Sequence, residues 1–103
     1  MKKVIDGKVY DTETAREIDS SSRGYVGDFR AYSESLYKTK KGAYFLSGKG
    51  GPASHYAVST EDGGYNGGSG IIPQTPAEAL TWCQHYSGAA TIENEFAGLI
   101  EEA

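Results

Sequence analysis

Short apolar runs separated by turn residues cover the first half of the chain, a pattern typical of antiparallel hairpins. Two such runs, 4–5 and 9–10, flank Asp6-Gly7, a pair that favours a type I′ turn because both of its positions accept a positive φ. The strongest strand signal extends from 29 to 47, where Tyr, Phe and Leu flank a loop at 40–42 that ends in Gly42. We therefore predict an N-terminal hairpin and a second hairpin at the centre of an antiparallel sheet.

The segments between these hairpins give weaker signals. Residues 11–18 are compatible with either a strand or one helical turn. Thr14 and Glu17 have the spacing of a helical capping box, but the segment has too few apolar residues to form a clear helical stripe. Residues 19–28 are rich in Ser and Gly, which predicts a turn or loop.

The second half of the chain predicts two helices. Thr75 is placed as N-cap, Pro76 as first helical residue and Glu78 as the partner of Thr75 in a capping box, with Gly88 closing the helix. Its apolar face consists of Ala79, Trp82, Cys83 and Tyr86. A last helix is predicted from Thr91 to about Glu102, with an apolar stripe of Ile92, Phe96, Leu99 and Ile100.

This order of elements predicts an α+β fold. We expect a small, hairpin-rich antiparallel sheet of three to five strands, with two C-terminal helices packed on one face. Residues 1–103 are expected to form a single domain, in which a glycine-rich loop at 48–70 joins the strand-rich and helical parts.

That glycine-rich segment holds eight of the fourteen glycines, and it raises the question of a phosphate-binding loop. Lys49 is followed by Gly50, which does not match a Walker A loop, and Ala53 stands where a dinucleotide fingerprint needs its third glycine. Glu61 and Asp62 would also repel an anion. A structural or flexible loop is therefore the prediction.

Composition narrows the class of protein further. Cys83 is the single cysteine, so no intramolecular disulfide is available. The N-terminal "MKKVIDGK" lacks the apolar run of a signal peptide, and no window approaches the roughly 20 apolar residues of a membrane span. We expect a soluble, cytoplasmic protein that does not bind membranes.

The same inventory argues against an enzyme or a metal protein. Cys83 and His85, with His55 as a third residue, are too few for a usual zinc site. Cys83 lies on the apolar helix face, which predicts a buried thiol with no activating base. We expect no catalytic residue, no metal and no cofactor.

Charge is distributed unevenly along the chain. Residues 1–50 carry ten Lys and Arg against seven Asp and Glu, a net +3, whereas residues 51–103 carry seven acids and no Lys or Arg, a net −7. An acidic surface without basic residues would be steered toward a basic partner. The residues predicted to bind a protein partner are Glu61, Asp62, Tyr65, Glu93, Glu95, Glu101 and Glu102.

An alternative site lies on the central hairpin. Interleaved lysines and aromatics can contact phosphates and stack bases. The candidate nucleic-acid-binding residues are Tyr37, Lys38, Lys40, Lys41 and Tyr44. A third possibility is a structural module that self-associates through a sheet edge, so homo-oligomerisation stays open.

Three segments, "KVIDGKVYDTETA", "SLYKTKKGAYFLSGKGG" and "IIPQTPAEALTW", together resemble a family of small proteins found in bacterial chromosomes, phages and integrated elements. Small acidic proteins of such elements include anti-CRISPR inhibitors. The resemblance implies a stoichiometric inhibitor of a nucleic-acid-handling protein, such as a CRISPR nuclease or effector complex, with nucleic acid itself the less favoured partner. It implies no catalytic residue.

Overall fold

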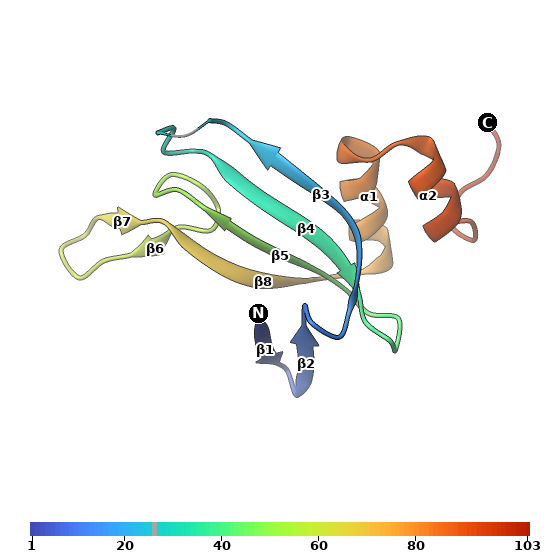
Figure 1. Cartoon of the computed structure of the whole chain (residues 1–103), viewed down its shortest axis with the longest axis horizontal. Helices are drawn as coiled ribbons and strands as arrows, with labels where there is room; N and C mark the ends of the chain where they lie inside the picture. The colour runs from blue at the N-terminus through green and yellow to red at the C-terminus, as the bar shows by residue number, and fades with distance from the viewer. Residues whose placement is uncertain (26) are drawn as a thin grey trace.

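The computed structural model describes residues 1–25 and 27–103, and it has the predicted α+β architecture (Figure 1). The strands are β1 (Lys2–Ile5), β2 (Lys8–Asp11), β3 (Arg16–Arg23), β4 (Tyr32–Lys38), β5 (Tyr44–Gly50), β6 (Val58–Ser59), β7 (Tyr65–Asn66) and β8 (Gly68–Gln74). The helices are α1 (Pro76–Tyr86) and α2 (Ala89–Glu95).

Both predicted hairpins are confirmed. β1 pairs antiparallel with β2, and the turn residues Asp6 and Gly7 have φ angles of 52° and 76°, as a type I′ turn requires. β4 pairs with β5 from Lys38 opposite Tyr44 onward, and Gly42 at the end of the loop has a φ of 93°. The main sheet is antiparallel in the order β3-β4-β5-β8, so the β4–β5 hairpin lies at its centre.

β3 decides one open alternative and corrects one prediction. It is a strand over the whole range Arg16–Arg23, so residues 16–18 take the strand alternative, and the first half of the loop predicted at 19–28 is wrong. Ser20 and Ser22 pair with Ser35 and Ser33 of β4, past a register shift between Glu17 and Asp19. Pairing with a neighbouring strand overrides the weak strand propensity of serine. Val26, also in the predicted loop, lies outside the described residues.

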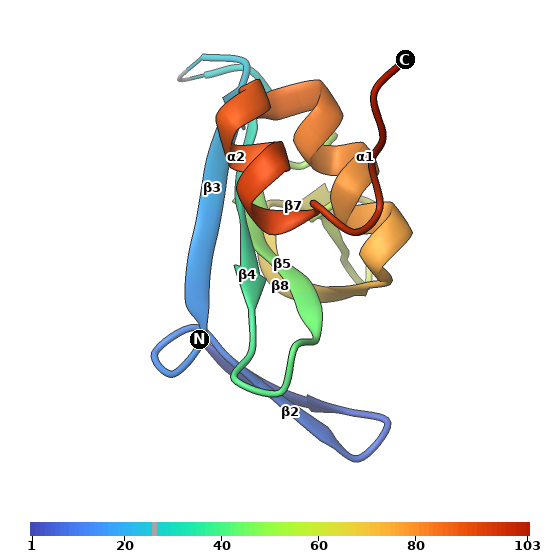
Figure 2. The same ribbon diagram turned by 90° about the vertical axis from the view of Figure 1, so that its right-hand side faces the viewer.

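The two faces of the sheet are covered differently (Figure 2). α1 and α2 lie on the same side of the sheet, where they bury a core of Leu36, Tyr44, Leu46, Ala79, Trp82, Cys83 and Phe96. On the other side Tyr10 of β2 packs its ring edge against Phe45, and Ile71 completes this smaller cluster. Fully burying one such large side chain contributes about 1.5–3 kcal/mol.

α1 begins as predicted. Glu78 N donates to Thr75 Oγ1 over 3.1 Å, and Thr75 N donates to Glu78 Oε1 over 2.9 Å, which completes the capping box. The buried thiol of Cys83 is confirmed, and burial raises its pKa. The helix ends at Tyr86 with Ser87 as its C-cap, and Gly88 instead caps the start of α2.

α2 is shorter than predicted. It ends at Glu95 and does not continue to Glu102. Phe96 is buried against the sheet, but Leu99, the next residue of the predicted apolar stripe, is 55% exposed and gives a further helical turn little to pack against. Gly98 also lowers helix propensity in this segment. Glu101 and Glu102 therefore follow the helix as exposed residues.

The molecule is elongated, with extents of 50 × 32 × 20 Å. The β6–β7 hairpin and the β3–β4 connection lie at one end, and α2 and the C-terminus lie at the other (Figure 1). Neither helix in the described part of the chain is long and apolar enough to cross a membrane.

Candidate functional site

The glycine-rich segment is packed against the sheet. A Cβ atom on Gly48 would collide with the ring of Tyr56, and one on Gly68 would lie 2.5 Å from the Tyr56 carbonyl oxygen. A Cβ on Gly51 would lie 2.6 Å from the carbonyl oxygen of Phe29. These glycines allow the 51–57 loop to lie directly on the strands, because a larger residue would leave no room for the loop. Their role is close packing.

Hydrogen bonds fix the same loop to the β3–β4 connection. Gly51 N donates to Ala31 O, and Ala53 N donates to Phe29 O, each over 2.8 Å. Within the loop, Ser54 Oγ donates to Gly51 O over 2.8 Å. Of the two alternatives predicted for this segment, a structural or a flexible loop, residues 51–57 therefore form the structural one, and they support the neighbouring connection.

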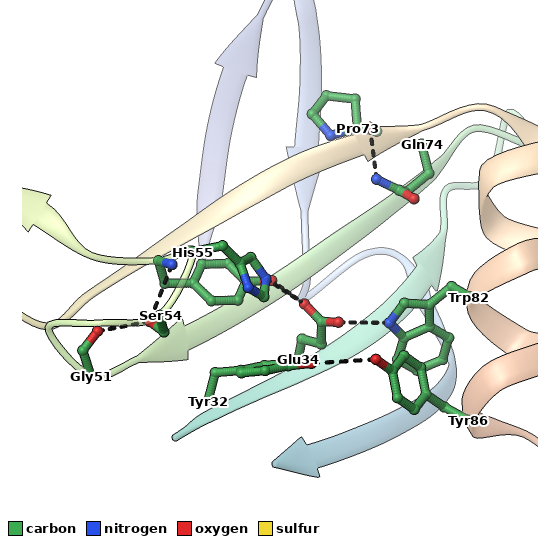
Figure 3. A network of polar contacts seen from close by, with 10 residues as sticks. Tyr32, Glu34, Gly51, Ser54, His55, Pro73, Gln74, Trp82 and Tyr86 are labelled. Atoms are coloured by element: carbon green, nitrogen blue, oxygen red, sulfur yellow. Dashed lines mark hydrogen bonds and ion pairs between the residues drawn. The ribbon is translucent and has the colours of Figure 1, made fainter. Parts of the chain in front are cut away.

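Glu34 of β4 is the central residue beneath this loop (Figure 3). Its Oε2 accepts a 2.6 Å hydrogen bond from the Tyr56 hydroxyl and lies 3.2 Å from His55 Nε2. Its Oε1 accepts a 2.7 Å hydrogen bond from Trp82 Nε1. One carboxylate thus joins β4, the 51–57 loop and α1.

The carboxylate of Glu34 is deeply buried, and its surroundings are mostly neutral. The side chain is only 4% exposed, and no Lys or Arg of the described residues forms an ion pair with it. Burial and the hydrogen bond to Glu34 raise the pKa of Tyr56 far above its usual range, so this donor stays protonated. The imidazole of His55, whose side chain is about half exposed, lies beside the carboxylate.

A cleft of about 490 Å³ opens beside this network, between α1 and the 51–57 loop. Its lining is Tyr32, Glu34, His55, Gln74, Ala77, Glu78, Thr81, Trp82, His85 and Tyr86. The hydroxyls of Tyr32 and Tyr86 lie 3.3 Å apart, and this contact, together with burial, raises the pKa of Tyr32. Half of the lining residues carry an aromatic or imidazole ring, the acidic ones are Glu34 and Glu78, and no Lys or Arg is among them.

The Glu34 network was not predicted from the sequence. Its members come from positions 34, 55, 56 and 82, and no local spacing joins them. The available signal was Glu34, the single glutamate of the central hairpin. It lies two positions before Leu36, so in a strand both side chains point to the same, inward face of the sheet.

The predicted acidic surface is not a single surface. Glu61 and Asp62 form the turn of the β6–β7 hairpin, with Tyr65 next to it, whereas Glu93, Glu101 and Glu102 lie at the opposite end of the molecule. Hydrogen bonds from Thr60 and from the backbone N–H of Gly64 lower the pKa of Asp62.

Glu95 is a correction to that set. Its side chain is only 9% exposed and pairs with Arg16 at 2.8 Å and Lys38 at 3.0 Å. The Tyr44 hydroxyl also donates to it over 2.9 Å. Burial by itself would raise the pKa of Glu95, but the hydrogen bonds from these partners outweigh it and lower the pKa. Glu95 fastens α2 to the sheet and is not free for a partner.

The aromatic residues of the alternative site are also engaged. Tyr44 is buried and stacks on Phe96, and Tyr37 stacks on Phe45 on the other face of the sheet. Lys38 is held by Glu95. Lys40 and Lys41 remain exposed, so the hairpin offers lysines without the predicted base-stacking pair.

Those two lysines line a second cleft. It has a volume of about 720 Å³ and lies between the β1–β2 hairpin and the β4–β5 loop. Lys2 and Lys8 line it from the first hairpin, and Asp11 is an acidic residue in the lining. The sequence did not indicate that these two lysine pairs would face one cleft.

Large exposed hydrophobic side chains gather at the end of the molecule opposite α2. Tyr25 and Phe29 lie on the β3–β4 connection, and Val58 and Tyr65 lie on the β6–β7 hairpin, each more than half exposed. We refer to these residues as the loop end. Of the four, Tyr65 was predicted as a binding residue; the signal for the others was aromatic residues among Gly and Ser.

The described residues hold no group of three or more His, Cys, Asp or Glu arranged for a metal ion. Comparison with known proteins finds no matching protein-family model, curated protein or solved structure.

Proposed function

We propose that this protein acts by binding another protein stoichiometrically, and that the loop end is its contact surface. The observation that carries the proposal is the exposure of Tyr25, Phe29, Val58 and Tyr65 on the β3–β4 connection and the β6–β7 hairpin, at one end of the molecule. Exposed aromatic residues that group in this way are typical of interaction surfaces.

The segments that carry these exposed side chains have a composition and a packing that suit protein binding. Tyr, Ser and Gly make up seven of the seventeen residues of 24–31 and 58–66; these residue types are also enriched in antibody binding loops, where tyrosine supplies contact area at a low entropic cost. The 51–57 loop is held by close glycine packing and by the Glu34 network. A partner would therefore meet a preorganised surface, which reduces the cost of ordering on binding.

The resemblance to mobile-element proteins gives the proposal a concrete form. In this form the chain is an anti-CRISPR-like inhibitor that occludes a nucleic-acid-handling protein in the bacterial cytoplasm. Glu61 and Asp62, which flank the loop-end hydrophobic residues, would face the basic surface of such a partner. Glu93, Glu101 and Glu102 are too distant to join this contact.

The experiment is a capture assay from a nuclease-treated host lysate. The triple variant Tyr25→Ser, Phe29→Ser, Tyr65→Ser should lose the captured protein, and the matched charge-reversal variant Glu93→Lys, Glu101→Lys, Glu102→Lys should retain it. Thermal melts of both variants would establish that they fold. The opposite result, with capture lost only in the charge-reversal variant, would place the contact at the helical end and overturn the proposal.

A second candidate function is binding of nucleic acid at the lysine-lined cleft. The observation in its favour is that Lys2, Lys8, Lys40 and Lys41 face one cleft. Lys2 is paired with Asp11 at 3.8 Å, and the ammonium groups of the other three lysines would attract a polyanion such as a phosphate backbone. Loss of all captured material on nuclease treatment would favour this function over the first.

A further inference from the structure

The buried carboxylate of Glu34 has hydrogen-bond donors on both oxygens but no Lys or Arg partner among the described residues. Burial of a carboxylate is costly unless a positive group pairs with it. Tyr56 and Trp82 donate hydrogen bonds as neutral groups, and His55 at 3.2 Å is the only ion-pair partner of this carboxylate among the described residues. The cleft beside the carboxylate is therefore a place where an added positive charge would be stabilised.

The walls of this cleft also suit a cation. Trp82, Tyr32 and Tyr86 line it with aromatic rings, and no Lys or Arg is among its lining residues. Aromatic faces attract guanidinium and alkylammonium groups through the ring quadrupole. The protein already uses this contact, since the Arg23 guanidinium lies 4.8 Å from the ring centroid of Tyr86.

We infer that the cleft between α1 and the 51–57 loop binds a cationic group, a guanidinium or an alkylammonium, with Glu34 as its counter-charge and the aromatic walls as its contact surface. The site does not depend on the loop end being a protein contact. Its occupant is either a free small cation or an arginine or lysine side chain of another protein.

Trp82 is the single tryptophan of the chain and lines the cleft, so its fluorescence reports binding directly. The probes are choline and N-acetyl-arginine amide, each compared with a neutral analogue of the same shape: 3,3-dimethylbutan-1-ol and N-acetyl-citrulline amide. We expect saturable fluorescence changes with the cations, and at least about tenfold weaker binding of the neutral analogues, as expected for loss of a charge-assisted contact.

Two substitutions test the residues. Glu34→Gln preserves shape and removes the charge, so cation affinity should fall about tenfold or more. Thr81→Lys places an ammonium at the exposed rim of the cleft and should block the site. Because Thr81 is exposed, this variant tests the site independently of whether Glu34→Gln folds. The control Gln84→Lys adds the same charge on α1 at a residue that does not line the cleft, and it should leave affinity unchanged.

Comparing the affinity for choline with that for a short peptide that contains arginine distinguishes a free small cation from a side chain of another protein. Equal affinity for choline and peptide arginine indicates a free cation, and clearly tighter binding of the peptide indicates a side chain of a partner. Equal binding of cationic and neutral probes, or no saturable signal with any cation, would overturn the inference. These outcomes are independent of the capture assay, so each idea can fail separately.

Discussion

Trp82 Nε1 donates a hydrogen bond of 2.7 Å to Glu34 Oε1, although the two residues are 48 positions apart. The bond links the inner face of α1 to the centre of the sheet. Because Glu34 also accepts from Tyr56, the helix and the glycine-rich loop are held through the same carboxylate. Stability and the shape of the cleft should therefore respond together to changes at this point.

Trp82→Phe should destabilise the protein by about 2–3 kcal/mol, because it leaves one oxygen of a buried carboxylate without its donor. Urea unfolding followed by far-ultraviolet circular dichroism measures this change. Gln84→Ala on the exposed side of α1 is the matched control and should stay within about 0.5 kcal/mol. Equal stability of Trp82→Phe and wild type would mean that the hydrogen bond contributes nothing measurable.

Gly48→Ala should destabilise the protein by about 1–3 kcal/mol, since the new methyl group would overlap the ring of Tyr56 and force the 51–57 loop away from the sheet. Gly98→Ala is the control, because a Cβ there meets nothing within 4 Å. The melting temperatures of the two variants give the comparison. A tolerated alanine at position 48 would show that the loop is not packed as described.

Glu95 should make stability depend on pH in the acid range. The pKa of its carboxyl is lower in the folded protein than in the unfolded chain, so its contribution is present above the unfolded value, about pH 4.3. That contribution is lost as pH falls through the folded pKa.

Glu95→Gln tests this dependence directly. The variant should be less stable than wild type by about 1–2 kcal/mol near neutral pH, a value between those of exposed and buried ion pairs, and the difference should shrink as the pH is lowered toward 3. Glu93→Gln, on the exposed side of α2, should show no such trend. A difference that stays constant with pH would contradict the assigned pairing with Arg16 and Lys38.

The lysine-lined cleft predicts a specific salt response. If it binds nucleic acid, affinity should fall steeply between about 50 and 200 mM salt. The variant Lys40→Ser, Lys41→Ser should weaken binding and flatten this slope, whereas Lys49→Ser, outside the cleft, should do neither. Fluorescence anisotropy with labelled DNA and RNA measures both effects, and the absence of binding at 50 mM would remove this candidate function.

The parts of the fold that the sequence predicted are those with local causes. Asp6-Gly7 and Gly42 define turns, and Thr75 with Glu78 defines a helix start, within a few residues each. Residues 19–23 of β3 were missed because their serines become strand through pairing with β4. The end of α2 was missed because it depends on where the sheet stops offering an apolar surface to the helix.

The exposure of the candidate site residues, too, was predicted correctly where local sequence decides it and wrongly where distant contacts decide it. Tyr65 was predicted from its own exposed, glycine-rich segment and is exposed in the structure. Glu95 was predicted as free because the second half of the chain has no basic residue, yet its partner Arg16 lies 79 positions away and meets it in space. The net charge of a sequence segment does not show which acidic residues pair with distant basic ones. The Glu34 network likewise joins residues that only folding brings together.

The close fit between Tyr56 and the glycines beneath it has a consequence for how this protein can diversify. Gly48 and Gly68 have no room for another side chain, whereas Tyr25, Phe29 and Tyr65 contribute little to the core and point into solvent. Among diverging copies of this chain, change should accumulate at the exposed tips while the glycines persist. The sheet would then stay constant while the exposed residues at its end vary from copy to copy.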